Sequence, residues 1–165
     1  MFMEQNTSKP VAQSNSKGGW LPPRIIVRAA WKIHKALYRW SGGRFGLRQP
    51  KLDTYGLAEL TTIGRKTGLQ RSVMIGYYLE DDAVVTMAMN GWGEAEPAWW
   101  LNLQANPQAT LTTTGGTIEV VGRAATAGAE HGALWDRWRH YDKGLDGWAS
   151  RRPTETAVVI LEPAR

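Results

Sequence analysis

The chain has 165 residues, a net charge of +5 and no cysteine. This length suits one domain with a substantial core, and a composition of 42% hydrophobic and 21% charged residues excludes wholesale disorder. The lack of cysteine excludes disulfides, thiolate nucleophiles and Cys-ligated metal sites, and the three histidines do not have the spacing of a zinc motif. We therefore expect a globular domain without a metal site.

Basic residues are concentrated in the first part of the chain. Up to Arg71 there are thirteen Lys or Arg against three Asp or Glu, whereas the rest of the chain has seven against twelve. This asymmetry predicts an anionic partner for the first part, whether a phosphate, a polycarboxylate, a lipid headgroup or a nucleic acid. No DNA- or RNA-binding motif accompanies the basic residues, so we expect no nucleic-acid partner.

The beginning of the chain divides into a tail and a helix. Residues 1–20 are polar and predict a flexible tail, so that residues 21–165 form the single domain. Residues 22–41 have apolar positions at helical spacing and predict a basic amphipathic helix, which either packs on the core or binds an anionic membrane surface through Trp31 and Trp40. Because neither a signal peptide nor a spanning segment is visible, we expect a cytoplasmic protein, peripheral on the inner face of the membrane if this helix binds lipid.

Strand patterns dominate the remaining sequence. The predicted strands span residues 55–63, 69–79, 83–89, 109–113, 117–123 and 156–161. The predicted helices span residues 96–105 and 128–139. Because short hairpin connections join the strands and the helices lie at the margins, we predict an α+β, mainly β fold built on an antiparallel barrel.

A glycine-bounded turn with the sequence GRKTG, residues 64–68, joins the first two predicted strands. Glycine lets the backbone turn with its N–H groups exposed, and such groups bind anions. Arg65, Lys66 and the nearby Arg71 add three cations. The pattern predicts a phosphate or carboxylate clamp, although a merely solvated hairpin turn can have the same composition.

Two segments together have a specific pattern: LTTIGRKTGLQR at residues 60–71 and PAWWLNLQANP at residues 97–107. With these segments the chain resembles the deazaflavin-dependent nitroreductases and F420H2-dependent quinone reductases, which are actinobacterial. The resemblance covers residues 57–163. It implies an antiparallel split β-barrel that uses coenzyme F420, an 8-hydroxy-5-deazaflavin, to transfer a hydride to a quinone, a nitroaromatic or an enone.

The resemblance also implies a cofactor site in two parts. The residues expected to bind the anionic tail of the coenzyme are Arg65, Lys66, Thr67 and Arg71. The residues expected to form a slot for the planar ring are Met74, Ile75, Gly76, Met87, Ala88, Met89, Asn90, Gly91, Trp99 and Asn102. Tyr141, or a water molecule near it, is the candidate proton donor.

Three other hypotheses remain open. An FMN-binding split-barrel oxidoreductase would share the fold, although its shorter phosphate tail needs fewer cations than the turn provides. A non-catalytic F420 carrier would release the cofactor unreacted, and a membrane-surface binding protein would act through residues 22–41.

Overall fold

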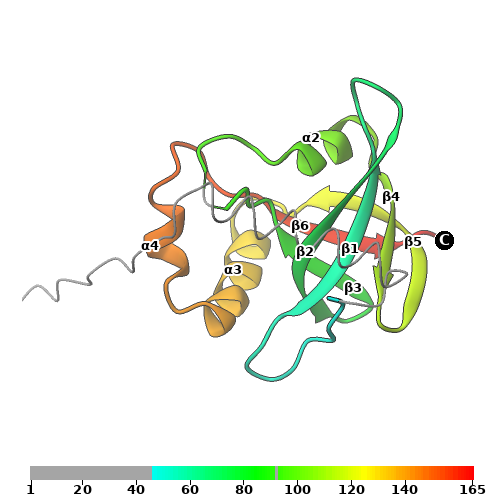
Figure 1. Ribbon diagram of the computed structural model, residues 1–165. Helices are drawn as coiled ribbons and strands as arrows, with labels where there is room; N and C mark the ends of the chain where they lie inside the picture. The colour runs from blue at the N-terminus through cyan, green and yellow to red at the C-terminus, as the bar shows by residue number, and fades with distance from the viewer. Residues whose placement is uncertain (1–45, 92) are drawn as a thin grey trace, which may run out of the picture.

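Six strands form a closed antiparallel barrel in the order β1-β2-β3-β6-β5-β4 (Figure 1). The computed structural model describes residues 46–91 and 93–165. The predicted tail and the predicted amphipathic helix, residues 1–20 and 22–41, lie outside this part of the chain. Where the structure describes the chain, it confirms the α+β, mainly β class and the antiparallel barrel.

The observed elements follow the predicted ones closely. The strands are β1 (Gly56–Ile63), β2 (Gln70–Glu80), β3 (Ala83–Met87), β4 (Gln108–Thr113), β5 (Gly116–Ala124) and β6 (Val158–Pro163). The helices are α2 (Ala98–Ala105), α3 (Ala129–Tyr141) and α4 (Leu145–Ala149). Within the described residues, each predicted strand and helix is present with its ends shifted by at most two residues. Helix α4 was not predicted, because its five residues are too short to show a helical period.

The inside of the barrel is one hydrophobic core, and helix α2 closes one of its ends. Strand β1 alternates strictly between buried and half-buried residues, which places Ala58 and Leu60 inside. Trp99, Trp100 and Leu103 of α2 belong to the same buried cluster. Helix α2 therefore lies across the end of the barrel near the β1–β2 turn, as Figure 1 shows.

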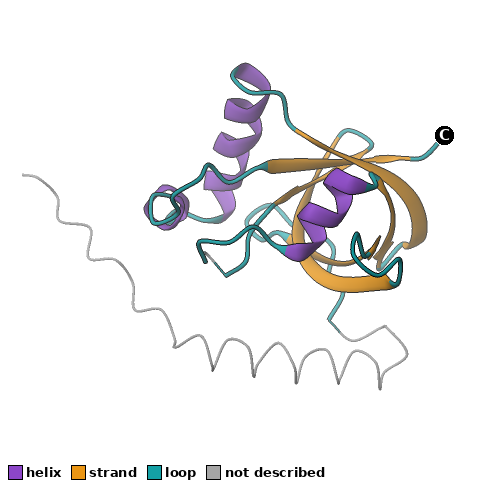
Figure 2. Cartoon of the chain, turned by 90° about the horizontal axis from the view of Figure 1, so that it is seen from above, coloured by secondary structure: helices purple, strands orange, loops and turns teal. Residues whose placement is uncertain are grey.

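A second core lies outside the barrel, where α3 and α4 pack together on one side (Figure 2). Tyr78 of β2 is fully buried there, and its hydroxyl donates a hydrogen bond to the Leu134 carbonyl of α3 at 3.1 Å. Burial raises the pKa of Tyr78, with a further contribution from Glu80, so this phenol stays a donor at neutral pH. In the described part of the chain, no helix has both the length and the apolarity needed to cross a bilayer.

Candidate functional site

The basic turn, residues 64–68, lies at the end of the barrel that α2 covers. The Gly64 N–H donates to the Leu69 carbonyl at 2.8 Å, and the Gly68 N–H donates to the Gly64 carbonyl at 2.7 Å. Gly68 has a φ of 67°, in the left-handed region where a residue without a Cβ avoids strain. The two glycines therefore set the tight shape of the turn.

Asn102 of α2 anchors this turn from the buried side. Its Oδ1 accepts hydrogen bonds from the backbone N–H of Arg65 at 3.1 Å and from Arg65 Nη1 at 3.3 Å. Its Nδ2 donates to Thr62 Oγ1 of β1 at 3.1 Å, and the residue is only 4% exposed. Asn102 was predicted as a ring contact, but its polar atoms are engaged within the protein. The structure thus shows it holding the turn in place.

The backbone amides of the turn differ from the expectation of exposed N–H groups. The Arg65 N–H donates to Asn102 Oδ1. The N–H groups of Thr67 and Gly68 both donate to the Gly64 carbonyl. The Leu69 N–H donates to Thr67 Oγ1. Only the Lys66 amide lacks a partner among the described residues. That expectation was wrong, because a turn this tight uses its own amides. Side chains must supply the positive potential here.

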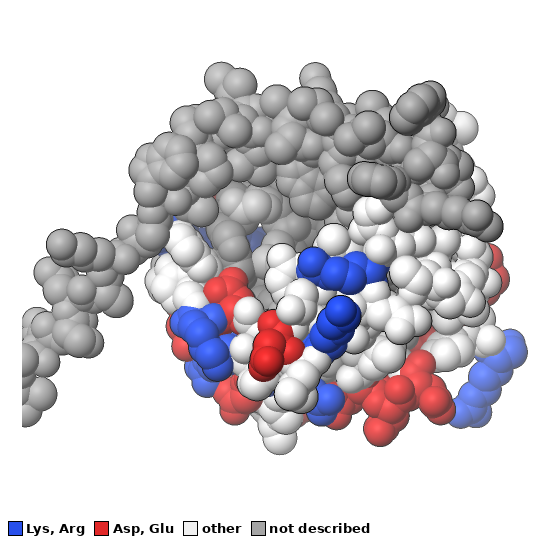
Figure 3. Space-filling model, turned by 60° about the horizontal axis from the view of Figure 1, so that its bottom comes forward, with Lys and Arg blue, Asp and Glu red and all other residues white. Residues whose placement is uncertain are grey.

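The side chains predicted to bind the tail are accessible. Arg65, Lys66, Thr67 and Arg71 are all exposed. None of the three cations forms an ion pair with a residue that the structure describes, whereas Arg123 is paired with both Glu130 and Glu162. On the face shown in Figure 3, by comparison, acidic side chains lie among the basic ones. The basic turn thus presents cations whose charge is available to an external anion.

The residues predicted to form the ring slot lie on opposite faces of the barrel wall. Ile75, Ala88 and Trp99 belong to the core inside the barrel and are at most 7% exposed. Met74 and Gly76 flank Ile75 along β2, so strand alternation places them on the outer face. The side chains of these two groups cannot all contact one flat ring, because the backbone of β2 separates them. The sequence-based prediction took neighbouring residues of β2 as one contact surface, although alternate residues of a strand face opposite sides.

Around Gly76, the outer face of β2 lies beside the end of β3. Thr86 Oγ1 donates to the Gly76 carbonyl at 2.7 Å, which ties β3 to this point. A Cβ at Gly76 would lie 3.1 Å from a ring carbon of Tyr55 and 3.7 Å from Trp138, so aromatic rings approach the backbone closely here. The rings of Tyr55 and Trp138 therefore already lie against the bare backbone at Gly76.

Met87, the last residue of β3, and Met89 lie on the same outer side, whereas Ala88 between them faces the inner core. Met87 and Met89 pack with the outer core that α3 and α4 cover. Asn90 and Gly91 are exposed, and Gly91 has a φ of 55°. Within the predicted slot, the outer side thus combines thioether side chains, bare backbone and an exposed turn.

Tyr141, the predicted proton donor, is located at the end of α3 on this side of the barrel. Its ring is stacked on Tyr78, with centroids 5.9 Å apart, and meets Trp138 edge-on at 6.0 Å. Trp138 is also the residue that approaches Gly76. The aromatic cluster therefore links Tyr141 to the outer face of β2.

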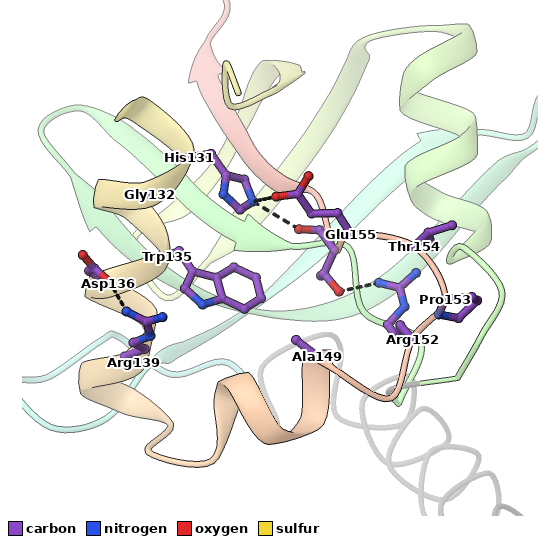
Figure 4. A pocket seen from close by; sticks show the side chains of 11 residues that line it. His131, Gly132, Trp135, Asp136, Arg139, Ala149, Arg152, Pro153, Thr154 and Glu155 are labelled. Atoms are coloured by element: carbon purple, nitrogen blue, oxygen red, sulfur yellow. Dashed lines mark hydrogen bonds and ion pairs between the residues drawn. The ribbon is translucent and has the colours of Figure 1, made fainter. Parts of the chain in front are cut away.

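A cleft that the sequence did not predict lies between α3, α4 and residues 152–156, with a volume of about 540 Å³ (Figure 4). The rings of His131 and Trp135 are stacked along its α3 wall, 5.6 Å apart. This volume is within the range of small-molecule sites. The cleft forms where three segments that are weakly patterned in the sequence meet, so no local motif indicated it.

Arg152, which lines this cleft, is a buried residue that was not predicted from the sequence. Its side chain is 0% exposed and forms an ion pair with Glu96 at 2.9 Å. The same guanidinium donates to the Ala88 carbonyl at 3.1 Å and to Thr156 Oγ1 at 2.7 Å. In the sequence, Arg151 and Arg152 have the pattern of two surface charges, because nothing local distinguishes a buried arginine from an exposed one.

Replacing Asn102 by alanine tests its role as the anchor of the basic turn. The change removes the partner of the Arg65 amide and of Thr62, so we expect a loss of about 1–3 kcal/mol in the free energy of unfolding. Denaturant titration measures the loss, and hydrogen exchange should show faster exchange at Arg65. Gln104→Ala, an exposed position of the same helix, is the control and should leave both unchanged. Equal behaviour of the two variants would contradict the anchor.

Comparison with known proteins identifies the family. Residues 30–163 match the model of the family described as F420H(2)-dependent quinone reductase. Two proteins named F420H(2)-dependent quinone reductase, from Mycobacterium tuberculosis strains CDC 1551 and H37Rv, are each 34% identical to the chain over 92 residues. The match covers 56% of this chain and 60% of each relative. The chain thus spans about 60% of the length of the curated relatives that it matches.

Solved structures show the same fold. One described as a domain-swapped dimer has a TM-score of 0.61 at 21% identity and covers 86% of this chain and 100% of its own. Another, named as an F420-H2 dependent reductase (FDR-A), has a TM-score of 0.58 at 21% identity and covers 64% and 93%. The family model extends over more than half of the sequence, including the basic turn and α2. The chain therefore belongs to the F420H(2)-dependent quinone reductase family.

Proposed function

We propose that this protein is a reductase that binds reduced coenzyme F420 and transfers a hydride from it to a quinone, a nitroaromatic or an enone. The observation that most supports this proposal is the anchored basic turn, where Arg65, Lys66 and the nearby Arg71 are exposed and have no ion pair among the described residues. Relatives named as F420H(2)-dependent quinone reductases make a quinone the first acceptor to test.

The basic turn fits the tail of this coenzyme. A phosphate followed by glutamates is a polyanion, and Arg65, Lys66 and Arg71 could bind several of its charges at once. The Asn102 anchor holds the turn before any ligand arrives, so binding would cost little ordering entropy. FMN has only one phosphate and would leave part of this charge unused, which favours F420 over the FMN alternative.

We place the ring on the outer face of the barrel, beside β2 and the end of β3. Met74 and Met89, with the exposed Asn90 and Gly91, are the proposed contacts, and Gly76 lies beneath the Tyr55 ring that borders them. Ile75, Met87, Ala88 and Trp99 would support this surface from their packed positions. Tyr55 lies against Gly76, so we propose it as one wall of the slot.

When bound, reduced F420 supplies the hydride, a pair of electrons with one proton. The chain supplies position, a surface from which water is partly excluded, and a second proton, so that a quinone becomes a hydroquinone. We propose Tyr141 as the donor of this second proton, because its phenol lies in the aromatic cluster that reaches Gly76. No side chain needs to form a covalent intermediate.

Replacing Lys66 by alanine tests the clamp. We expect F420 binding to weaken by about 1–3 kcal/mol, the scale of a lost charge-assisted hydrogen bond, and wild-type binding to weaken as salt rises. A fluorescence titration of F420 measures both effects. Lys143→Ala removes an exposed lysine from the connection between α3 and α4 and should bind F420 as wild type does. An unchanged dissociation constant for Lys66→Ala, with no salt dependence in wild type, would place the tail elsewhere.

Replacing Tyr141 by phenylalanine tests the proton donor. The ring and its stacking on Tyr78 remain, so F420 affinity should not change, but turnover with menadione should fall by about a hundredfold. Following F420 absorbance with the reduced coenzyme measures turnover, and the same assay distinguishes an enzyme from a carrier. Full turnover by Tyr141→Phe would mean that the proton comes from solvent or another group.

We also propose that residues 22–41 bind an anionic membrane surface, where a lipid-soluble quinone would be available. The proposal rests on the basic amphipathic pattern of this segment. Flotation with anionic vesicles tests it: the full chain should float at low salt, and a chain that begins at Ser41 should not. Equal flotation of the two would contradict membrane binding by this segment.

A further inference from the structure

One buried guanidinium joins the two ends of the loop between β3 and α2. Arg152 Nη1 donates to the carbonyl of Ala88, the first residue after β3, at 3.1 Å. Its Nη2 donates to Glu96 Oε1 at 2.9 Å, one residue before Pro97, the N-cap of α2. We propose that Arg152 is a positioning residue that closes residues 88–96 at their base. The further step, that this loop positions the cofactor ring, rests on the proposed function.

In the described part of the chain, neighbouring elements fix both ends of the loop, since α2 begins after Pro97 and packs into the barrel core. The start of the loop is fixed by the barrel, because the Ala88 N–H donates to the Ala157 carbonyl at 2.9 Å. Further along, the backbone bonds of the loop are local: the Met89 N–H donates to Met87, and the Gly93 N–H donates to Asn90. Among the described residues, Arg152 is the side chain that bonds to both ends, so it links Glu96 directly to Ala88 and shortens the free span.

Burial and a third hydrogen bond hold the Arg152 guanidinium in a fixed position. Its side chain is fully buried, whereas Glu96 is 28% exposed, so the guanidinium has no solvent to replace a lost partner. Thr156 Oγ1, at 2.7 Å, adds a third bond from the segment that leads into β6. The planar fork of arginine reaches these three acceptors from two separate nitrogens, whereas a lysine would need all three within reach of a single nitrogen.

The pair is not arranged for stability alone. Arg152 Nε and Glu96 Oε2 are buried, and neither has a hydrogen-bond partner among the described residues. Buried polar atoms without partners cost free energy, and apolar residues of similar volume often replace a buried ion pair without loss of stability. What apolar residues cannot replace is the fixed geometry between Ala88 and Glu96. In the proposed role of Arg152, this geometry sets the positions of Met89, Asn90 and Gly91, which follow β3.

The test measures loop position in the full chain without any ligand. The double variant Arg152→Met with Glu96→Leu keeps the volume of the buried pair and removes the bonds across the loop. We expect hydrogen exchange of peptides covering residues 88–96 to become at least tenfold faster, with exchange in β2 and β5 unchanged. Arg139→Met, which removes an exposed arginine of the same cleft paired with Asp136 and Asp146, is the matched control and should leave the loop unchanged.

A second variant keeps the test valid if the double variant fails to fold. Glu96→Gln retains the length of the side chain and one acceptor oxygen but removes its charge, so exchange in the loop should rise to a smaller extent. Wild-type exchange of residues 88–96 in a folded double variant, or in Glu96→Gln where only that variant folds, would overturn the proposal.

A separate measurement tests whether the loop positions the cofactor ring. In the folded double variant, the basic turn is intact, so F420 affinity should change by less than threefold while kcat with menadione falls at least tenfold. Faster loop exchange with an unchanged kcat would overturn the role in ring placement. Failure of the wild-type protein to bind F420 would overturn the proposed function instead, and the exchange result would still decide whether Arg152 closes the loop.

Discussion

The hydrogen bonds of one buried amide, that of Asn102, hold the basic turn against the end of the barrel. Through them α2, β1 and the turn become one rigid unit, with Arg65 bound by both its backbone and its side chain. Cations on a mobile hairpin would lose entropy on binding an anion, whereas here the backbone is already ordered. The buried amide thus allows three neighbouring cations to act as a preformed site, and the proposed binding of a polyanionic tail depends on it.

The barrel wall then determines which residues face a ligand. Inside, Leu60 and Trp99 belong to a closed core, and outside, β2 and β3 support the aromatic cluster of Tyr78, Trp138 and Tyr141. A ring on the outer face would rest on a wall made stiff by the inner core. The loop that borders this face is tied down by Arg152, so the two buried polar residues, Asn102 and Arg152, secure the two parts of the proposed site separately.

The fold could be predicted from sequence because its information is local. Alternation along residues 56–63 and the glycines of the turn specify strands and a hairpin without knowledge of the rest of the chain. The same strand alternation in β2 also predicts that Ile75 and Gly76 face opposite sides of the barrel wall. The prediction of the ring slot did not use this alternation, because it took residues 74–76 together as one contact surface. The roles of Asn102 and Arg152 depend on partners 37 and 56 residues away, so no local pattern could show them.

The proposed function depends most on which cofactor the chain binds. The most direct measurement is a parallel titration of the purified full chain with F420 and with FMN at low and at high salt. We expect that F420 binds, that its affinity falls as salt rises because the clamp is electrostatic, and that FMN binds far more weakly. Tight binding of FMN together with no binding of F420 would contradict the proposed function.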